Sequence, residues 1–198
     1  NMQITKLATQ VKNTDRVNVF IDGIYEFSLS LNELLEHKLK VGQELDSSQI
    51  ELLKKVSTKG KLKTQTIDWL FRRPHSEQEL VAYLKRKKVD SNEISEIVEL
   101  MKARKYQDNN SFTIWWIDQR LSSNKSKKYI TQELLTKGIK RSEIEDAFKK
   151  FNLSEEKQIE NLVKKKNLTK KYPDEQKLVT YLLRQGFSYD SIKNFMNR

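Results

Sequence analysis

The sequence contains no cysteine, and only two histidines, two prolines and five glycines among its 198 residues. Without cysteine there is neither a disulfide framework nor a thiol nucleophile, and His37 and His75 lack the spacing of a zinc site. No glycine opens a strand-to-helix turn followed by Lys and Ser or Thr, so a phosphate-binding loop is missing. Acidic residues do not cluster as a two-metal nuclease requires. We therefore expect no metal, no cofactor and no catalytic activity.

Long hydrophobic runs are also missing. The longest aromatic and apolar stretch is Ile114 to Ile117, far below the ~20 residues of a membrane-spanning helix. The start lacks the basic and then apolar pattern of a secretory signal, which predicts a cytosolic protein with no membrane partner. Asn1 ahead of Met2 is interpreted as an expression remnant.

Charge is abundant and unevenly distributed. Charged residues make up 33% of the chain and hydrophobic residues 36%, which favours thin helical modules over one wide core. Residues 1–60 hold eight basic and eight acidic residues, so the whole net charge of +11 lies on residues 61–198. A basic domain favours polyanionic partners, with nucleic acid first and acidic protein surfaces next, although a lysine-rich solvated surface is an alternative.

The first thirty residues have the alternating pattern of strands. Apolar residues alternate from Thr5 to Val11 and again from Val17 to Ile21, which predicts that residues 3–29 are mainly strand. Asp22-Gly23 predicts a two-residue hairpin turn, because both of its central positions need a positive φ. The hairpin is expected to present two apolar faces. One holds Phe20, Tyr25 and Phe27, and the other holds Val17, Val19, Ile21 and Ile24.

Two short helices are predicted after the strands. Ser30 and Glu33 form a capping box ahead of a leucine-rich helix that should end at Gly42. Asp46 with Gln49 marks the start of the second helix, which carries apolar residues as far as Val56. The stretch from residue 57 to residue 64 has no apolar period and is interpreted as a linker.

From Thr66 onward the pattern is helical and repeats three times. Each unit opens with an apolar trio at i, i+3, i+4 spacing, continues with a second helix that ends at a turn, and closes with a third helix. The trios are Ile67/Leu70/Phe71, Phe112/Trp115/Trp116 and Ile159/Leu162/Val163, and the turns fall at Lys88, Gly138 and Gly186. Leu84, Leu134 and Leu182 are separated by 50 and 48 residues, and Ile94, Ile144 and Ile192 show the same two offsets.

These shared offsets predict a mainly α protein. We expect three tandem three-helix repeats in an elongated array, preceded by a small N-terminal module of a β-hairpin and short helices. The predicted domains are residues 1–60 for the N-terminal module, and residues 66–107, 108–152 and 153–198 for the three repeats. The protein is expected to be a monomer.

Basic residues concentrate at the end of the first helix of each repeat, in the loop that follows, and on the second helix. In the first two repeats we predict a binding surface for a polyanionic or acidic partner. Its candidate residues are Arg72, Arg73, Lys85, Arg86, Lys87, Arg120, Lys125, Lys127, Lys128 and Lys137. Lysines near a helix C-terminus also complement the helix dipole, which leaves a structural interpretation open for Lys85 to Lys88 and for Lys137.

A helix-turn-helix protein is the main alternative, because a glycine turn joins two helices in the repeats. The second helix of each such pair begins with carboxylates, for example at Asp90 and Glu143, and these would repel phosphate. Trp115 and Trp116 raise the alternative of base stacking. However, the apolar period claims at least Trp116, so core packing is favoured.

These same segments resemble the RecX family over about residues 66–198. The residues that carry the resemblance are Arg72 to Leu80, then Tyr106, Asp108, Phe112, Trp116 and Arg120, then Ile130 to Leu134 with Lys137 to Ile139, and finally Arg184 to Ile192. The neutral N-terminal module is similar to an extension that some members carry. Two departures concern turn shape. Lys88 stands where the other repeats have glycine, and the basic loop from Asn124 to Lys128 lacks a glycine.

The resemblance implies a modulator that binds RecA, lies along the groove of the RecA filament on single-stranded DNA, and usually limits filament growth, strand exchange and coprotease activity. It thereby implies a role in DNA repair, DNA recombination and the SOS response. Weak direct contact with DNA is a further possibility. The other class of function is a nucleic-acid-binding protein that acts independently of RecA.

Overall fold

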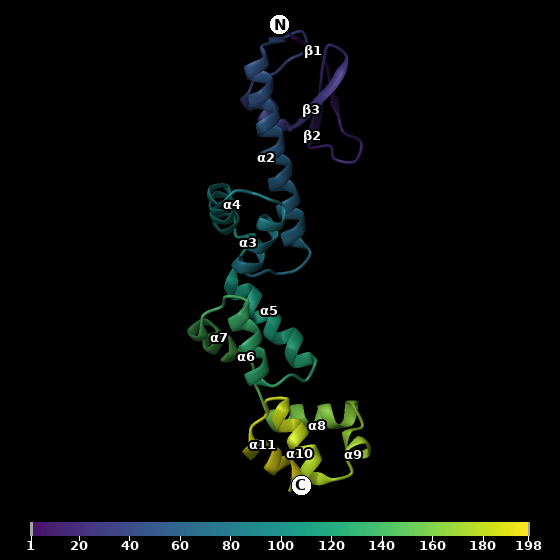
Figure 1. The fold of residues 1–198 in the computed structure, drawn as a ribbon, viewed down its shortest axis with the longest axis vertical. Coiled ribbons are helices and arrows are strands. Elements are labelled where there is room, and N and C mark those ends of the chain that lie inside the picture. The colour runs from purple at the N-terminus through teal and green to yellow at the C-terminus, as the bar shows by residue number, and fades with distance from the viewer. Residues whose placement is uncertain (1, 198) are drawn as a thin grey trace. The chain divides into compact units, whose positions relative to one another are not determined.

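The computed structural model describes residues 2–197, which divide into an N-terminal unit that ends at Trp69 and a C-terminal unit that begins at Leu70. The N-terminal unit contains a four-stranded sheet in the order β3-β2-β1-β4. Figure 1 labels β1, β2 and β3. The strands are β1 (Met2–Thr9), β2 (Arg16–Ile21), β3 (Ile24–Ser30) and β4 (Glu44–Leu45), and the pairs they form are antiparallel. The prediction that residues 3–29 are mainly strand is confirmed.

The hairpin between β2 and β3 turns at Asp22 and Gly23, whose φ values of 49° and 84° confirm the predicted turn. The predicted faces are wrong in part. The register pairs Phe20 with Tyr25 but Val19 with Phe27, so β3 carries one extra residue at this point. This bulge moves Phe27 to the face of Val19, where both are buried in the core.

The helices of the N-terminal unit differ from the prediction in length. The capping box of Ser30 and Glu33 is confirmed, but α1 (Leu31–Glu36) ends at His37 and not at Gly42. The second helix, α2 (Ser47–Phe71), is 25 residues long and runs through the predicted linker, so the linker is wrong. The stretch contains one glycine and no proline, and the buried Ser57 hydroxyl donates to the Ser28 carbonyl at 2.6 Å. The helix is therefore continuous through residues 57–64 and joins the apolar segments on either side.

The C-terminal unit contains the three predicted helical repeats (Figure 1). Repeat 1 combines the end of α2 with two further helices, and the other two repeats supply all their own. The elements are α3 (Glu77–Arg86) and α4 (Ser91–Ala103); α5 (Asn109–Ser122), α6 (Lys127–Thr136) and α7 (Arg141–Phe148); and α8 (Glu155–Lys165), the short α9 (Leu168–Lys171), α10 (Glu175–Arg184) and α11 (Tyr189–Met196). The mainly α fold of three three-helix repeats behind a small strand and helix module is confirmed, while the limits of the individual domains stay predictions.

The turns that end the second helices adopt the same backbone conformation in all three repeats. Lys88, Gly138 and Gly186 have φ values of 59°, 79° and 87°, which lie in the left-handed region. Lys88 therefore makes the same turn as the two glycines, although a residue with a side chain is strained in this region. The departure from the family pattern at Lys88 leaves the turn unchanged.

The first helices are less uniform than the predicted trios. Ile159, Leu162 and Val163 are all buried in repeat 3, as predicted. In repeat 2 Phe112 is buried, whereas Trp115 and Trp116 pack half-buried against the core. In repeat 1 Leu70 is buried, but the burial predicted for Phe71 is wrong. Its side chain is 66% exposed because it is the last residue of α2 and no helix turn follows to cover it.

Candidate partner-binding surface

Eight of the ten predicted basic residues fall into two groups. Arg73, Arg120 and Lys137 make ion pairs with carboxylates inside the C-terminal unit. Others are exposed and make no ion pair with any residue among 2–197. These are Arg72, Lys85, Arg86, Lys127 and Lys128. Sequence reasoning treated both groups alike, because it does not reveal which cations meet a carboxylate.

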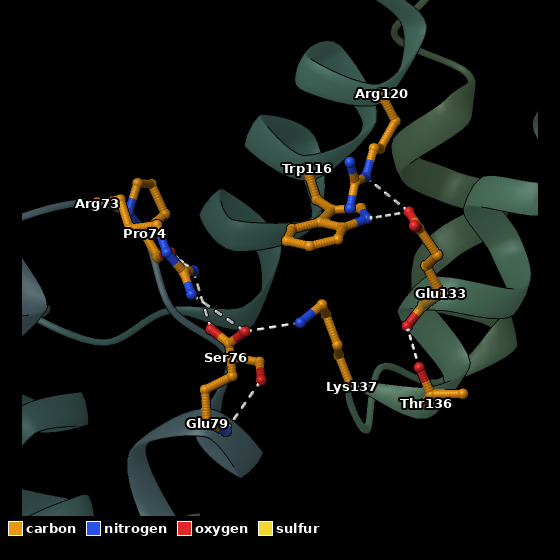
Figure 2. Close-up of polar contacts among 9 residues, drawn as sticks. All are labelled: Arg73, Pro74, Ser76, Glu79, Trp116, Arg120, Glu133, Thr136 and Lys137. Carbon is orange, nitrogen blue, oxygen red and sulfur yellow. Dashed lines mark hydrogen bonds and ion pairs between the residues drawn. The ribbon is translucent and has the colours of Figure 1, made fainter. Parts of the chain in front are cut away.

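The carboxylate of Glu79 joins repeat 1 to repeat 2 (Figure 2). Arg73 donates to it through two nitrogens, at 2.9 Å and 3.2 Å, and Lys137 donates through Nζ at 2.7 Å. Glu79 lies in the first turn of α3, whereas Lys137 is the C-cap of α6 in the next repeat. Arg73, Glu79 and Lys137 are called the Glu79 network below. It is a contact between repeats, which makes Arg73 and Lys137 structural residues first.

Burial raises the pKa of the Glu79 carboxyl, but the hydrogen bonds and positive charges of Arg73 and Lys137 outweigh it and hold the pKa below its usual range. Neighbouring His75 is buried beside the same network. Its pKa is lowered, first by burial and then by the charge of Arg73. Both shifts favour a carboxylate and a neutral imidazole near neutral pH.

A second carboxylate organises repeat 2. Glu133 Oε2 accepts from Arg120 Nε at 2.8 Å and from the indole N–H of Trp116 at 2.9 Å. The cations of Arg120 and Lys137 lie 4.4 Å and 4.3 Å from the centroid of the Trp116 ring (Figure 2). Trp116 also packs on Phe112, with ring centroids 5.6 Å apart. These contacts occupy the indole and support the packing interpretation over base stacking.

The loop from Ser123 to Ser126 and the first turn of α6 carry the cationic cluster of repeat 2. Lys125 lies 4.3 Å from the ring centroid of Tyr129, and Lys127 lies 5.1 Å from that of Phe148. Lys128 is exposed on the first turn of α6. A cluster at a helix N-terminus works against the helix dipole, so dipole compensation does not explain it. Lys125, Lys127 and Lys128 are called the α6 cluster below.

The α3 cations lie at the opposite end of their helix. Lys85 and Arg86 are in its last turn and Lys87 is its C-cap, with the ammonium 5.4 Å from the centroid of the Tyr83 ring. Cations at this end complement the dipole of α3, so their position has a structural explanation. They are weaker candidates for partner contact than the α6 cluster.

Repeats 2 and 3 meet through a different contact that sequence reasoning missed. The Ser126 hydroxyl caps α6 by accepting from Tyr129 N–H, and it donates to the Gln185 carbonyl at 2.7 Å. A Cβ on Gly186 would lie 2.7 Å from the same hydroxyl oxygen. The turn of repeat 3 therefore packs on the start of α6, as the turn at Gly138 packs on Gln78 at the start of α3. The signal was present, because Ser76 and Ser126 cap α3 and α6 and are 50 residues apart.

The third helices begin with carboxylates, as expected. The first turns of α4, α7 and α11 contain Glu93, Glu143 and Asp190, and the Asp90 side chain caps α4. These ends are unsuited to a phosphate backbone, which argues against docking of these helices into a DNA groove. A groove between repeats 1 and 2 offers no alternative anion site, because carboxylates and cations line it in equal number. They are Glu77, Asp108 and Glu143, with Lys102, Lys105 and Lys140.

The fold and the surface define a class of protein. The described residues form a small β-sheet module followed by basic three-helix repeats, and they contain no group of three or more acidic or histidine side chains placed to hold a metal ion. No described helix is long and apolar enough to cross a membrane. These features define a basic protein built from a small β-sheet module and three-helix repeats.

Comparison with known proteins identifies the family to which the chain belongs. Residues 2–46 match the RecX N-terminal domain, and residues 63–99 match the first three-helix domain of RecX. A regulatory protein RecX from Oceanobacillus iheyensis is 35% identical over 93% of this chain and 72% of its own length. The RecX of Bacillus pumilus is 34% identical over 96% of this chain and 74% of its own length. The chain belongs to the RecX family, and both of these relatives are regulatory proteins.

Two crystal structures share the fold. A regulatory protein RecX matches with a TM-score of 0.74 and 24% identity over the whole of both chains. RecX from Lactobacillus salivarius matches with a TM-score of 0.60 and 21% identity, over 70% of this chain and 94% of the other. At these identities the likeness concerns the fold, and it agrees with the arrangement of strands and helical repeats described above.

Proposed function

We propose that this protein binds RecA or the RecA nucleoprotein filament on single-stranded DNA and limits its ATPase, strand-exchange and coprotease activities, as a cytosolic regulator without catalytic activity. The observation that carries the proposal is membership of the RecX family, which the N-terminal module and the first repeat both support. The position of the charge agrees with it, because the whole +11 lies on residues 61–198. A RecA filament with its DNA offers the acidic and polyanionic partner that such a surface suits.

The α6 cluster is the proposed centre of contact. Its three lysines are close together in sequence, they make no ion pair within residues 2–197, and the helix dipole does not account for them. Arg120 is assigned to the scaffold, because its guanidinium pairs with Glu133. It stays unchanged in the variant below, since a glutamate at position 120 would face the Glu133 carboxylate. The α3 cations supply a second, weaker part of the surface.

The test is the ATPase activity of RecA on single-stranded DNA, titrated with the protein and with a variant in which Lys125, Lys127 and Lys128 are replaced by Glu. The variant should remain helical by circular dichroism and should lose most of its inhibition. The matched control replaces the exposed Lys165, Lys166 and Lys170 of repeat 3 by Glu, which changes the net charge equally. Full inhibition by the α6 variant, or equal loss in the control, would refute the assignment of the surface.

The alternative is a nucleic-acid-binding protein that acts without RecA through helix-turn-helix-like repeats. The charge of the repeats favours it, and the carboxylates at the starts of α4, α7 and α11 oppose it. Binding of the protein to duplex DNA in the absence of RecA distinguishes the two. High affinity for a duplex together with unchanged RecA activity would select the alternative.

A further inference from the structure

An exposed aromatic pair lies on repeat 1, apart from the α6 cluster. The rings of Phe71 and Tyr106 meet edge to face, with centroids 5.2 Å apart and planes at 77°. Phe71 is 66% exposed and Tyr106 is 36% exposed. The pair joins the C-terminal end of α2 to the segment that follows α4.

Three cations without an ion-paired carboxylate among residues 2–197 are neighbours of this pair in sequence. Arg72 follows Phe71, and Arg104 and Lys105 precede Tyr106 in the chain. All three are exposed, and none makes an ion pair with another described residue. Phe71, Arg72, Arg104, Lys105 and Tyr106 are called the aromatic patch below. The dipoles of α2 and α4 account for cations at their C-terminal ends, but they do not account for two exposed rings.

In the other two repeats, the side chain equivalent to Phe71 is covered by other residues of the protein. Trp116 in repeat 2 is covered by Arg120 and Lys137 and bonded to Glu133, and Val163 in repeat 3 is buried. Only Phe71, among these three residues, leaves most of its side chain in water. The aromatic patch thus combines exposed rings with cations nearby in sequence, but among the described residues no cation lies over the Phe71 ring as Arg120 and Lys137 lie over Trp116.

We propose that the aromatic patch binds single-stranded nucleic acid directly, with unstacked bases on Phe71 and Tyr106 and phosphates on Arg72, Arg104 and Lys105. Exposed aromatic rings beside Arg and Lys are the combination that binds single strands, because every base has a face that can stack. A duplex keeps its bases stacked on each other and offers these rings only its backbone and groove edges. This binding is independent of the proposed contact with RecA.

The test measures fluorescence anisotropy of the full-length protein with a labelled oligothymidylate of roughly 15 nucleotides, without RecA. A strand of the same length made of abasic units keeps the phosphates and lacks the bases. Phe71→Leu and Tyr106→Leu keep an apolar side chain and remove the aromatic face. Each should weaken binding to oligothymidylate at least about fivefold, since stacking on one ring contributes this much or more. Neither should change binding to the abasic strand.

The cations are tested separately by replacing Arg72, Arg104 and Lys105 with Gln one at a time. Each change should flatten the dependence of log affinity on log salt by roughly 0.7, on both strands. Tyr189→Leu, which alters an exposed tyrosine of repeat 3, is the matched control and should bind both strands like the unchanged protein. Circular dichroism verifies the helical content of every variant.

Three results would overturn the proposal. The first is an unchanged protein that does not bind oligothymidylate, and the second is leucine variants that bind both strands as the unchanged protein does, or that lose affinity for both equally. The third is leucine variants that keep their affinity for the strand but lose inhibition of RecA, which would make the patch a protein-binding surface. The last outcome leaves the proposed regulation of RecA intact, whereas loss of strand binding with full inhibition supports the patch and separates it from that regulation.

Discussion

Replacing Glu79 by glutamine removes the charge that joins repeats 1 and 2 while keeping the shape of the side chain. The carboxylate accepts three hydrogen bonds, two from Arg73 and one from Lys137, at 2.9, 3.2 and 2.7 Å. Its side chain is 18% exposed, and those of Arg73 and Lys137 are 36% and 24% exposed. Glutamine leaves two partly buried cations without their anion.

The magnitude follows from this partial burial. Exposed ion pairs contribute about 0 to 1 kcal/mol, and loss of one partner from a fully buried pair costs about 3 to 5 kcal/mol. The Glu79 network lies between these limits, so Glu79→Gln should lower the free energy of unfolding by about 2 kcal/mol. Urea denaturation followed by tryptophan fluorescence measures it, since Trp115 lies beside Arg73 and Trp116 beside Lys137.

Two controls make the reasoning refutable. Glu99→Gln removes an exposed carboxylate that pairs with Lys102, and it should cause no measurable loss. Lys137→Met combined with Glu79→Gln should cost less than the sum of the single changes, by roughly 1 kcal/mol, because the two residues share one contact. A Glu79→Gln loss no larger than that of Glu99→Gln, or strictly additive effects with Lys137→Met, would show that the network does not couple the repeats.

Three further predictions concern pH and the turns. The pKa of Glu79 is lower in the folded protein than in the unfolded chain, so its stabilisation is complete above the ordinary pKa of about 4.3 and is lost as the pH falls through the folded value. Melting temperatures between pH 7 and pH 3 should therefore fall less steeply for Glu79→Gln than for the unchanged protein, and parallel curves would contradict this. Gly186→Ala should lower the free energy of unfolding by about 2 kcal/mol or more, because the strain of a left-handed φ adds to the clash with the buried Ser126 hydroxyl. Denaturant titration should show a smaller loss for Gly138→Ala, because the flexible Gln78 side chain can move away from the new methyl group. Lys88→Gly should stabilise by about 0.5 to 1 kcal/mol in the same assay, because it relieves a φ of 59°, and a loss of stability would mean that the lysine side chain contributes more than the strain.

Local chemistry made several features of this protein predictable. Asp22-Gly23 turns the hairpin because few other pairs accept two positive φ values, and the Ser30 and Glu33 capping box starts α1 from a four-residue signal. The leucines at 84, 134 and 182 are all buried, because the 3.6-residue period requires one face of each second helix to meet the core. The predicted linker at residues 57–64 was wrong, because a missing apolar period does not end a helix that contains no proline.

The sequence alone determined the class of fold, the three repeats and the family, because capping, turn residues and apolar period act within a few residues of each other. Only the tertiary structure decided which cations pair with a carboxylate. Glu79 and Lys137 are 58 residues apart, and they meet because the turn at Gly138 packs on the start of α3. Phe71 has the spacing of a core residue, yet its position as the last residue of α2 leaves it exposed. Such outcomes depend on where helices end and how repeats dock, and no local pattern encodes that geometry.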